Sequence, residues 1–154
     1  MTVIKAENLV KDYGLNGQTV HALRSVNLEF QEGEFAAIAG PSGSGKSTFL
    51  HLAGCLDAIS GGRITVGGED VSRLNKRRLA LLRRLQIGFI FQAYNLIPVL
   101  SAEENIAFPL ILLGVEKREV KNRVEQALAD VGLGGMGKRR PKEMSGGQQQ
   151  RVAI

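Results

Sequence analysis

The sequence predicts an α/β fold in two parts, and three observations support this. Short β-type runs alternate with glycine-rich turns over residues 1–92. Apolar residues at helical spacing, with helix-start signals before them, fill residues 93–154. Within the first part, a glycine-rich loop joins an apolar run to the start of a helix. A mixed α/β core followed by a helical subdomain accounts for all three.

The first part is expected to contain five strands, at residues 3–9, 25–30, 35–39, 63–66 and 87–91. The run at 35–39 is apolar throughout, which is typical of a strand with both faces covered. One helix is expected to begin near Lys46, directly after the glycine-rich loop, and another to cover residues 76–85.

The second part is expected to be helical. Ser101 and Glu104 form a capping box ahead of an apolar stretch that ends at Gly114. The next helix should end at Gly132 in a left-handed conformation. Pro141 then separates it from a third helix, capped by Ser145. The apolar stripe of the middle helix consists of Val120, Val124, Ala127, Leu128 and Val131.

The composition is that of a globular chain without a membrane span. Of 154 residues, 44% are hydrophobic, and no apolar run reaches the roughly 18–20 residues that cross a bilayer. Charged residues interrupt the N-terminus, which argues against a secretory signal peptide. Cys55 is the single cysteine, so no disulfide framework is expected, and we interpret it as a small buried apolar residue.

Basic side chains give the chain a formal net charge of +5. They gather in three clusters, at residues 76–78, 83–84 and 138–140. Such clusters are compatible with a nucleic-acid face, but no aromatic residue interleaves with them to stack on bases. We favour the alternative of solvated helix faces on a protein near an anionic membrane surface, with no nucleic acid as partner.

The glycine-rich loop matches the phosphate-loop pattern G-x-x-x-x-G-K-[ST]. Its glycines allow a tight turn in which backbone N–H groups point at phosphate oxygens, and the helix start adds a positive dipole end. Lys46 supplies a cation for the outer phosphates, and the Ser47 hydroxyl is an oxygen ligand for Mg²⁺. The residues expected to bind nucleotide are Gly40, Ser42, Gly43, Ser44, Gly45, Lys46, Ser47 and Thr48.

The loop alone indicates a P-loop NTPase without saying which kind. The alternative, a glycine-rich turn beside a solvated lysine, is disfavoured by the apolar run before it and the helix after it. A GTPase would need an Asn-Lys-x-Asp element for guanine. The nearest string, at residues 75–78, lacks the aspartate.

A second motif, Ser145-Gly146-Gly147-Gln148, has two interpretations. Ser-x-x-Gln is a capping box, worth about 1 kcal/mol to a helix. Two consecutive glycines do not suit that purpose, because each costs about 1 kcal/mol inside a helix. They suit a backbone that approaches a ligand closely, so the motif also predicts a second anion site at a helix start.

Together, these motifs make the chain resemble the nucleotide-binding domain of ABC transporters. MSGGQQQRVAI resembles the family's signature helix, with Met144 in place of the usual leucine, and FIFQAYNLIP resembles its glutamine loop. The strings HLAGCLD and IGFIFQAYNLIPVLSAEENIAFPL are similar to the subfamily of lipoprotein-release and macrolide-export ATPases. The resemblance implies an ABC-type P-loop fold, with an N-terminal β-subdomain and a helical subdomain.

The resemblance also implies roles for single residues. Gln92 would lie near Mg²⁺ and the attacking water, so that Lys46 and Gln92 are the candidate catalytic residues and Ser47 and Gln92 the candidate metal ligands. Tyr13 resembles the aromatic residue that stacks on adenine, although a lone tyrosine near a turn is more often a packing residue. Stacking needs an aromatic face and no hydroxyl, so a phenylalanine should serve equally well.

For the complete protein, the resemblance implies two Mg-ATP molecules between two head-to-tail copies. Each ATP would meet the phosphate loop of one copy and Ser145, Gly146, Gly147 and Gln148 of the other. A transmembrane permease would dock near residues 92–98, which places the protein in the cytoplasm on the inner face of the cell membrane.

Family members also need an apolar strand ending in Asp-Glu and a later histidine, and neither occurs in these residues. We therefore expect a C-terminally truncated domain that does not hydrolyse ATP as it stands. Two rival hypotheses are a non-catalytic ATP-binding remnant and a soluble ABC ATPase acting on nucleic acid or the ribosome.

Overall fold

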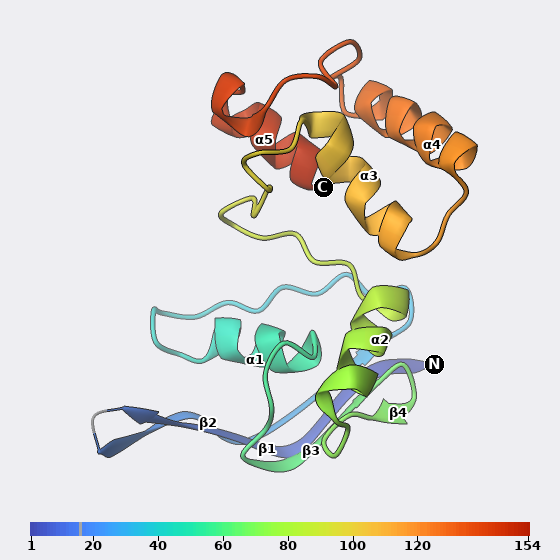
Figure 1. Cartoon of the computed structure of the whole chain (residues 1–154). Helices are drawn as coiled ribbons and strands as arrows, with labels where there is room; N and C mark the ends of the chain where they lie inside the picture. The colour runs from blue at the N-terminus through green and yellow to red at the C-terminus, as the bar shows by residue number, and fades with distance from the viewer. Residues whose placement is uncertain (16) are drawn as a thin grey trace. The chain divides into compact units, whose positions relative to one another are not determined.

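The computed structural model describes residues 1–15 and 17–154, which form two units, Met1–Gly88 and Phe89–Ile154 (Figure 1). The first unit is built on an antiparallel sheet. Strands β1 (Thr2–Leu15) and β2 (Gln18–Gln31) pair along nearly their whole length. Strand β3 (Gly61–Val66) pairs with the other side of β1, and the short β4 (Glu69–Asp70) completes the order β2-β1-β3-β4.

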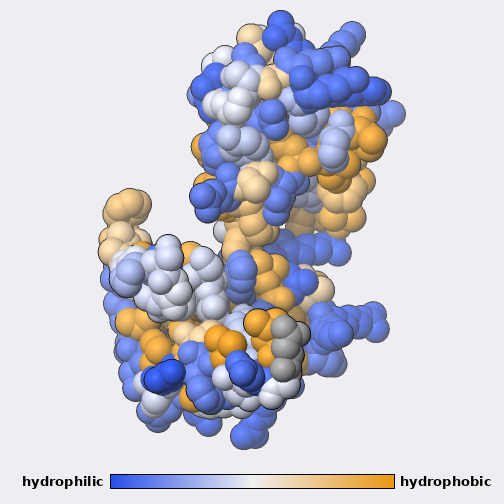
Figure 2. All heavy atoms as spheres, turned by 90° about the vertical axis from the view of Figure 1, so that its left-hand side faces the viewer, coloured by the Kyte–Doolittle hydropathy of each residue, from blue (hydrophilic) through white to orange (hydrophobic). Residues whose placement is uncertain are grey.

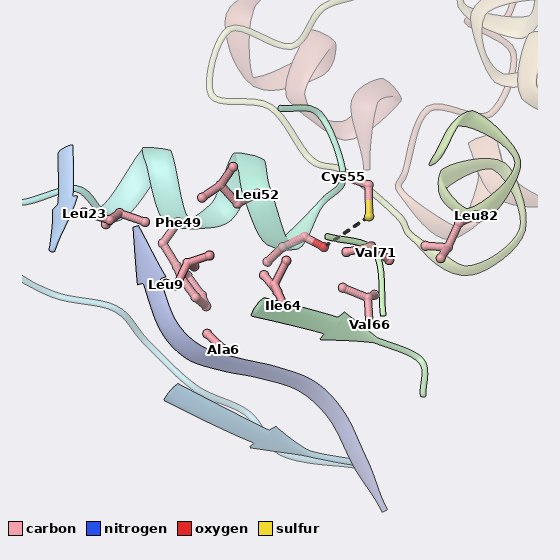
Figure 3. Packing of buried hydrophobic residues seen from close by; sticks show 11 residues of the cluster. Ala6, Leu9, Leu23, Phe49, Leu52, Cys55, Ile64, Val66, Val71 and Leu82 are labelled. Carbon is pink, nitrogen blue, oxygen red and sulfur yellow. Dashed lines mark hydrogen bonds between the residues drawn. The ribbon is translucent and has the colours of Figure 1, made fainter. Parts of the chain in front are cut away.

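Helices α1 (Lys46–Ala53) and α2 (Lys76–Gln86) cover one face of this sheet (Figure 1). Figure 3 shows Phe49 and Leu52 of α1 packed toward Leu9 and Ile64 of the sheet. Each of these side chains is at most 3% exposed. Burying such a side chain contributes about 1.5–3 kcal/mol, so the sheet holds α1 firmly in place.

Cys55 follows α1 and is buried in the same core (Figure 3). Among the described residues, its thiol has no partner other than a weak contact of 4.0 Å to the Ala53 carbonyl oxygen. Burial raises the pKa of the thiol, opposed by the nearby charge of Arg83. The prediction of a small buried apolar residue is confirmed.

The second unit consists of α3 (Ala102–Leu112), α4 (Lys117–Asp130), a short 3₁₀ turn η1 (Pro141–Glu143) and α5 (Gly146–Ala153). The capping box of Ser101 and Glu104 starts α3, and Gly132 ends the α4 region with a φ of 68°, both as the sequence predicts. The predicted stripe of α4 is the buried face, since Val120, Val124 and Leu128 join one core with α3 and α5 residues.

Two predicted strands are wrong. Residues 35–39 and 87–91 have no strand conformation, and neither joins the sheet among the described residues. A strand exists only in a ladder with a partner, and apolar sequence alone does not supply one. Phe35 is fully exposed rather than covered on both faces. Phe89 and Phe91 stack on each other instead, with ring centroids 5.2 Å apart.

Apolar side chains also reach the surface among charged ones on both units (Figure 2). Most are single residues of helices and turns, such as Leu85, Val99 and Ile111. In the described part of the chain, no helix has both the length and the apolar character that a membrane crossing requires.

Candidate functional site

The glycine-rich loop leads directly into α1, and glycine is required at its last turn. Gly45 precedes the helix with a left-handed φ of 87°. A β-carbon there would lie 2.7 Å from both the Ala22 carbonyl oxygen and the Leu23 Cδ2 atom, so no larger residue fits. Gly43 has a φ of 83° but open space around it, so its requirement is conformational. The sequence-based argument for a tight glycine turn is therefore supported at both positions.

Lys46 folds its side chain back over this loop. Its Nζ atom donates hydrogen bonds to the carbonyl oxygens of Gly40 at 2.9 Å and Pro41 at 2.7 Å, and to Ser44 Oγ at 3.2 Å. The positive charge is therefore held above the loop rather than extended into solvent. Three oxygen acceptors around one ammonium group mark the place where phosphate oxygens would compete for the same protons.

The start of α1 has no side-chain cap. The first N–H groups of a helix need partners, and the N-terminal end of the helix dipole favours negative charge. The loop side chains Ser42 and Ser44 are exposed, as is Ser47 in the first turn of α1. This arrangement is suited to an anion, which would supply the acceptors that the chain itself does not.

Ser47 is the residue of this loop best suited to hold a magnesium ion. Its side chain is exposed one residue after Lys46, and a hydroxyl oxygen is the type of donor that Mg²⁺ takes alongside phosphate oxygens. Thr48, the next residue, is half-buried. Gln92, the other candidate ligand, is exposed and belongs to the second unit, so its role rests on the resemblance.

Tyr13, at the end of β1, belongs to a polar cluster that the sequence did not indicate. Its hydroxyl donates a hydrogen bond to Asp57 Oδ2 at 2.9 Å. The Lys11 ammonium lies over the ring, 4.6 Å from its centroid, and forms an ion pair of 2.9 Å with Asp57 Oδ1. The Tyr13 side chain remains 37% exposed. The stacking argument gave the hydroxyl no function, whereas the structure gives it a defined partner.

The pKa values in this cluster reflect its geometry. Desolvation raises the pKa of Tyr13, the Asp57 hydrogen bond raises it further, and Thr48 and Lys11 oppose the shift. Burial also acts to raise the pKa of Asp57, but hydrogen bonds from Lys11, Tyr13 and the Ala58 N–H outweigh it and leave that pKa below its usual value. Tyr13 is therefore a neutral donor to an ionised carboxylate at neutral pH.

The second motif forms the start of α5. Ser145 Oγ accepts a hydrogen bond from the Gln148 N–H at 3.3 Å, and Gln148 Oε1 accepts one from the Ser145 N–H at 2.9 Å. The capping box is therefore present. Gly146 and Gly147 are exposed beside it, which leaves their backbone open to a ligand. Met144 is buried in the core of the second unit, as expected of a residue in place of leucine.

A contact inside the second unit links this motif to the segment after Gln92. Tyr94 has a left-handed φ of 61°, and its hydroxyl oxygen lies 3.0 Å from where a β-carbon of Gly146 would be. Any side chain at position 146 would have to displace the Tyr94 hydroxyl. Sequence reasoning missed this contact, because nothing in the residues between 94 and 146 indicates it.

Comparison with known proteins decides the family. Residues 23–154 match the family model described as ABC transporter. The chain belongs to the ABC transporter family. An ABC transporter ATP-binding protein of Thermotoga maritima is 51% identical over 99% of this chain. The macrolide export ATP-binding/permease protein MacB of Mannheimia succiniciproducens is 42% identical over the whole chain. The chain spans 65% of the former and 24% of the latter.

Solved structures give the same family. The dimeric ATP-binding cassette MJ0796 is 42% identical, with a TM-score of 0.92 over 99% of this chain and 67% of that one. Its post-hydrolysis state bound to ADP and Pi gives a TM-score of 0.91 at 41% identity. The predicted fold class, part of an ABC-type nucleotide-binding domain, is thereby confirmed. The predicted likeness to macrolide-export ATPases is confirmed as well.

Proposed function

We propose that this ABC family chain is the ATP-binding part of a transporter subunit, in which binding and hydrolysis of Mg-ATP drive a separate membrane permease. One observation carries the proposal, which is the loop before α1. It combines an uncapped helix start with a lysine ammonium bound to three loop oxygens. That combination suits a triphosphate.

In this proposal, residues of the first unit, together with Gln92, bind one nucleotide along its length. The loop amides and Lys46 hold the outer phosphates, and Tyr13 stacks on adenine. Ser47 and Gln92 hold Mg²⁺, which when bound neutralises charge on the phosphates. Gln92 also orients the attacking water. The chain's contribution to phosphoryl transfer is then positioning and charge stabilisation.

A second copy of the chain would complete the site. We propose a head-to-tail pair in which Ser145, Gly146, Gly147 and Gln148 of one copy meet the phosphates held by the other. The exposed glycines at the start of α5 support this, because they allow close approach by a ligand. The solved cassette MJ0796 is dimeric, which is the precedent for a pair.

The permease is proposed to dock on the second unit near residues 92–98, so that the protein is cytoplasmic and peripheral to the membrane. A cavity of about 510 Å³ supports this location. Apolar residues from that segment and from α3 line it, among them Leu96, Ile97 and Phe108. We also propose that residues 1–154 alone hydrolyse no ATP, because they contain no Asp-Glu pair.

The test is Lys46→Ala in the complete natural polypeptide, with Lys121→Ala as the matched control. Lys121 is exposed on α4 and pairs there with Glu125. Lys46→Ala should lower ATP turnover on the order of a hundred-fold or more and weaken ATP binding, because it removes a cation from the transferred phosphate. Phosphate release and calorimetric titration with ATP measure both effects. Near-normal turnover by Lys46→Ala would sink the proposal.

A further inference from the structure

Hydrogen bonds join the C-terminal end of β1 to the loop that follows α1. The Lys11 ammonium donates to the Ala58 carbonyl oxygen at 2.7 Å, and the Ser60 N–H donates to the Val10 carbonyl oxygen at 2.9 Å. The Asp12 N–H donates to Ser60 Oγ at 2.9 Å. The position of Tyr13 therefore depends on residues 57–60, which lie directly after the helix that starts at the phosphate loop.

Lys11 is an unusual residue for this purpose, because its charged side chain is only 9% exposed. Burying an ammonium group is unfavourable unless charge and hydrogen bonds compensate it. Here Asp57, the Ala58 carbonyl and the face of the Tyr13 ring together surround it. The Tyr13 ring is therefore one of the three groups that compensate this buried charge.

Two restraints act on Tyr13 at different places. Asp57 fixes the hydroxyl at the far end of the side chain, and Lys11 lies against a face of the ring. Because Lys11 also pairs with Asp57, the carboxylate orients both groups at once. The ring plane is thus set before any ligand arrives, which reduces the ordering that binding would otherwise require.

We propose that Lys11 and Asp57 are positioning residues for the nucleotide base, which act by fixing the plane of the Tyr13 ring. The inference rests on the proposed function, in which Tyr13 stacks on adenine. It goes further by assigning two residues of the chain to base binding and by giving the tyrosine hydroxyl a role. Neither residue touches the base or the phosphates.

The test compares binding of ATP with binding of inorganic triphosphate in the complete polypeptide, by calorimetry. Asp57→Asn and Lys11→Met should each weaken ATP binding several-fold and leave triphosphate binding unchanged, since the phosphate loop stays intact. Asp12→Asn is the matched control, because Asp12 is adjacent on β1 but accepts its hydrogen bond from His21. The control should bind both ligands as the parent does.

Combination with Tyr13→Ala separates positioning from general structure. Tyr13→Ala alone should weaken ATP binding about ten-fold or more, as loss of a stacked base predicts. Adding Asp57→Asn to it should cause no further loss, because the carboxylate then has no ring to orient. An additive loss, or an equal loss of triphosphate binding, overturns the positioning role.

A spectroscopic measurement reports on the hydrogen bond between Tyr13 and Asp57. The phenol absorbance of Tyr13, taken as the difference from Tyr13→Phe, reports its pKa. The groups that face the phenol are Asp57, Lys11 and Thr48. Removing the Asp57 charge should lower the Tyr13 pKa, because that carboxylate disfavours the phenolate, and Asp12→Asn should not. An unchanged Tyr13 pKa in Asp57→Asn shows that the contact is absent in solution and overturns the inference.

The outcomes distinguish the two proposals. If Tyr13→Ala binds ATP as tightly as the parent, adenine stacking fails and the inference fails with it. If Tyr13→Ala binds weakly while Asp57→Asn binds normally, stacking stands and only the positioning role is overturned. Asp57 is 34% exposed, and in Asp57→Asn the Lys11 ammonium keeps the Ala58 carbonyl and the Tyr13 ring, so this variant decides the test alone if Lys11→Met gives no folded protein.

Discussion

The starts of α1 and α5 carry the two motifs from which the sequence predicts anion sites, and the two starts differ in their capping. The α1 start follows Gly45 in a left-handed conformation and has no side-chain cap. The α5 start follows Ser145 and has a complete capping box with Gln148. Both sequences predicted an anion site, but only the α1 start has no side-chain cap, so a helix-start motif by itself does not determine whether the first turn is capped.

The two helices differ in what stabilises them, which is burial of side chains for α1 and capping for α5. An uncapped start forgoes about 1 kcal/mol, and α1 recovers it through Phe49 and Leu52, which are buried against the sheet. Helix α5 buries little beyond Val152, so its cap contributes a larger share of its stability. Helix α1 is therefore stabilised mainly by its buried side chains, and its first turn has no side-chain cap. The first turn of α5 is capped by its own residues, Ser145 and Gln148.

The largest expected effect concerns residues 1–154 on their own. They contain both helix starts but no Asp-Glu pair to hold Mg²⁺ through water and polarise the nucleophile. Phosphoryl transfer depends on such positioned groups. The ATP turnover of residues 1–154 should therefore be several powers of ten below that of the complete polypeptide, at the background of the assay. A steady-state phosphate-release assay on the purified chain measures it.

Lys46→Ala of the same chain is the control, since it reports contaminating ATPases. Turnover that this substitution abolishes would mean that a residue within 1–154 replaces the missing glutamate. Residues 1–154 would then suffice for hydrolysis, and the proposal that they are inactive alone would be wrong.

The next largest effect is expected for Gly45→Ala, which tests whether the start of α1 requires a glycine. In Gly45→Ala, the left-handed backbone costs about 1–2 kcal/mol, and the new β-carbon also meets the Ala22 carbonyl at 2.7 Å. Both the free energy of unfolding and the ATP affinity should fall. Gly134→Ala is the control, because a β-carbon there meets nothing within 4 Å. Urea unfolding of the two variants that gives equal values would show that the α1 loop tolerates a side chain.

Local signals were enough to predict the helices and both helix starts. Ser101, Ser145 and Gly132 act through hydrogen bonds or backbone angles of nearby residues, so their pattern can be read from the sequence. Strand pairing depends on partners far along the chain, so the apolar runs at 35–39 and 87–91 were misassigned.

In the candidate site too, residues close together in the sequence could be predicted and residues far apart could not. The loop from Gly40 to Thr48 was found because its residues are consecutive. Lys11 and Asp57 were missed because 46 positions separate them. Asp57 ends the string HLAGCLD, but that string does not indicate a partner on β1. A buried lysine in a strand gives no sequence signal that differs from that of an exposed one.

The smallest expected effect separates capping from ligand binding at α5. Ser145→Ala should reduce the free energy of unfolding by about 1 kcal/mol, because the Gln148 N–H loses its acceptor. Ser101→Ala is the matched control, since Ser101 caps α3 through the same geometry with Glu104. Urea unfolding should show a loss of similar size in both variants.

Turnover of the complete polypeptide then distinguishes the two serines. If the Ser145 hydroxyl also donates to the phosphate held by a second copy, Ser145→Ala should lower turnover at saturating ATP, while Ser101→Ala should not. Its hydrogen remains free for this, because the capping bond uses the oxygen as an acceptor. Equal turnover in the two variants would mean that Ser145 only caps the helix, and α1 would then be the one helix start of the pair that binds phosphate through its own first turn.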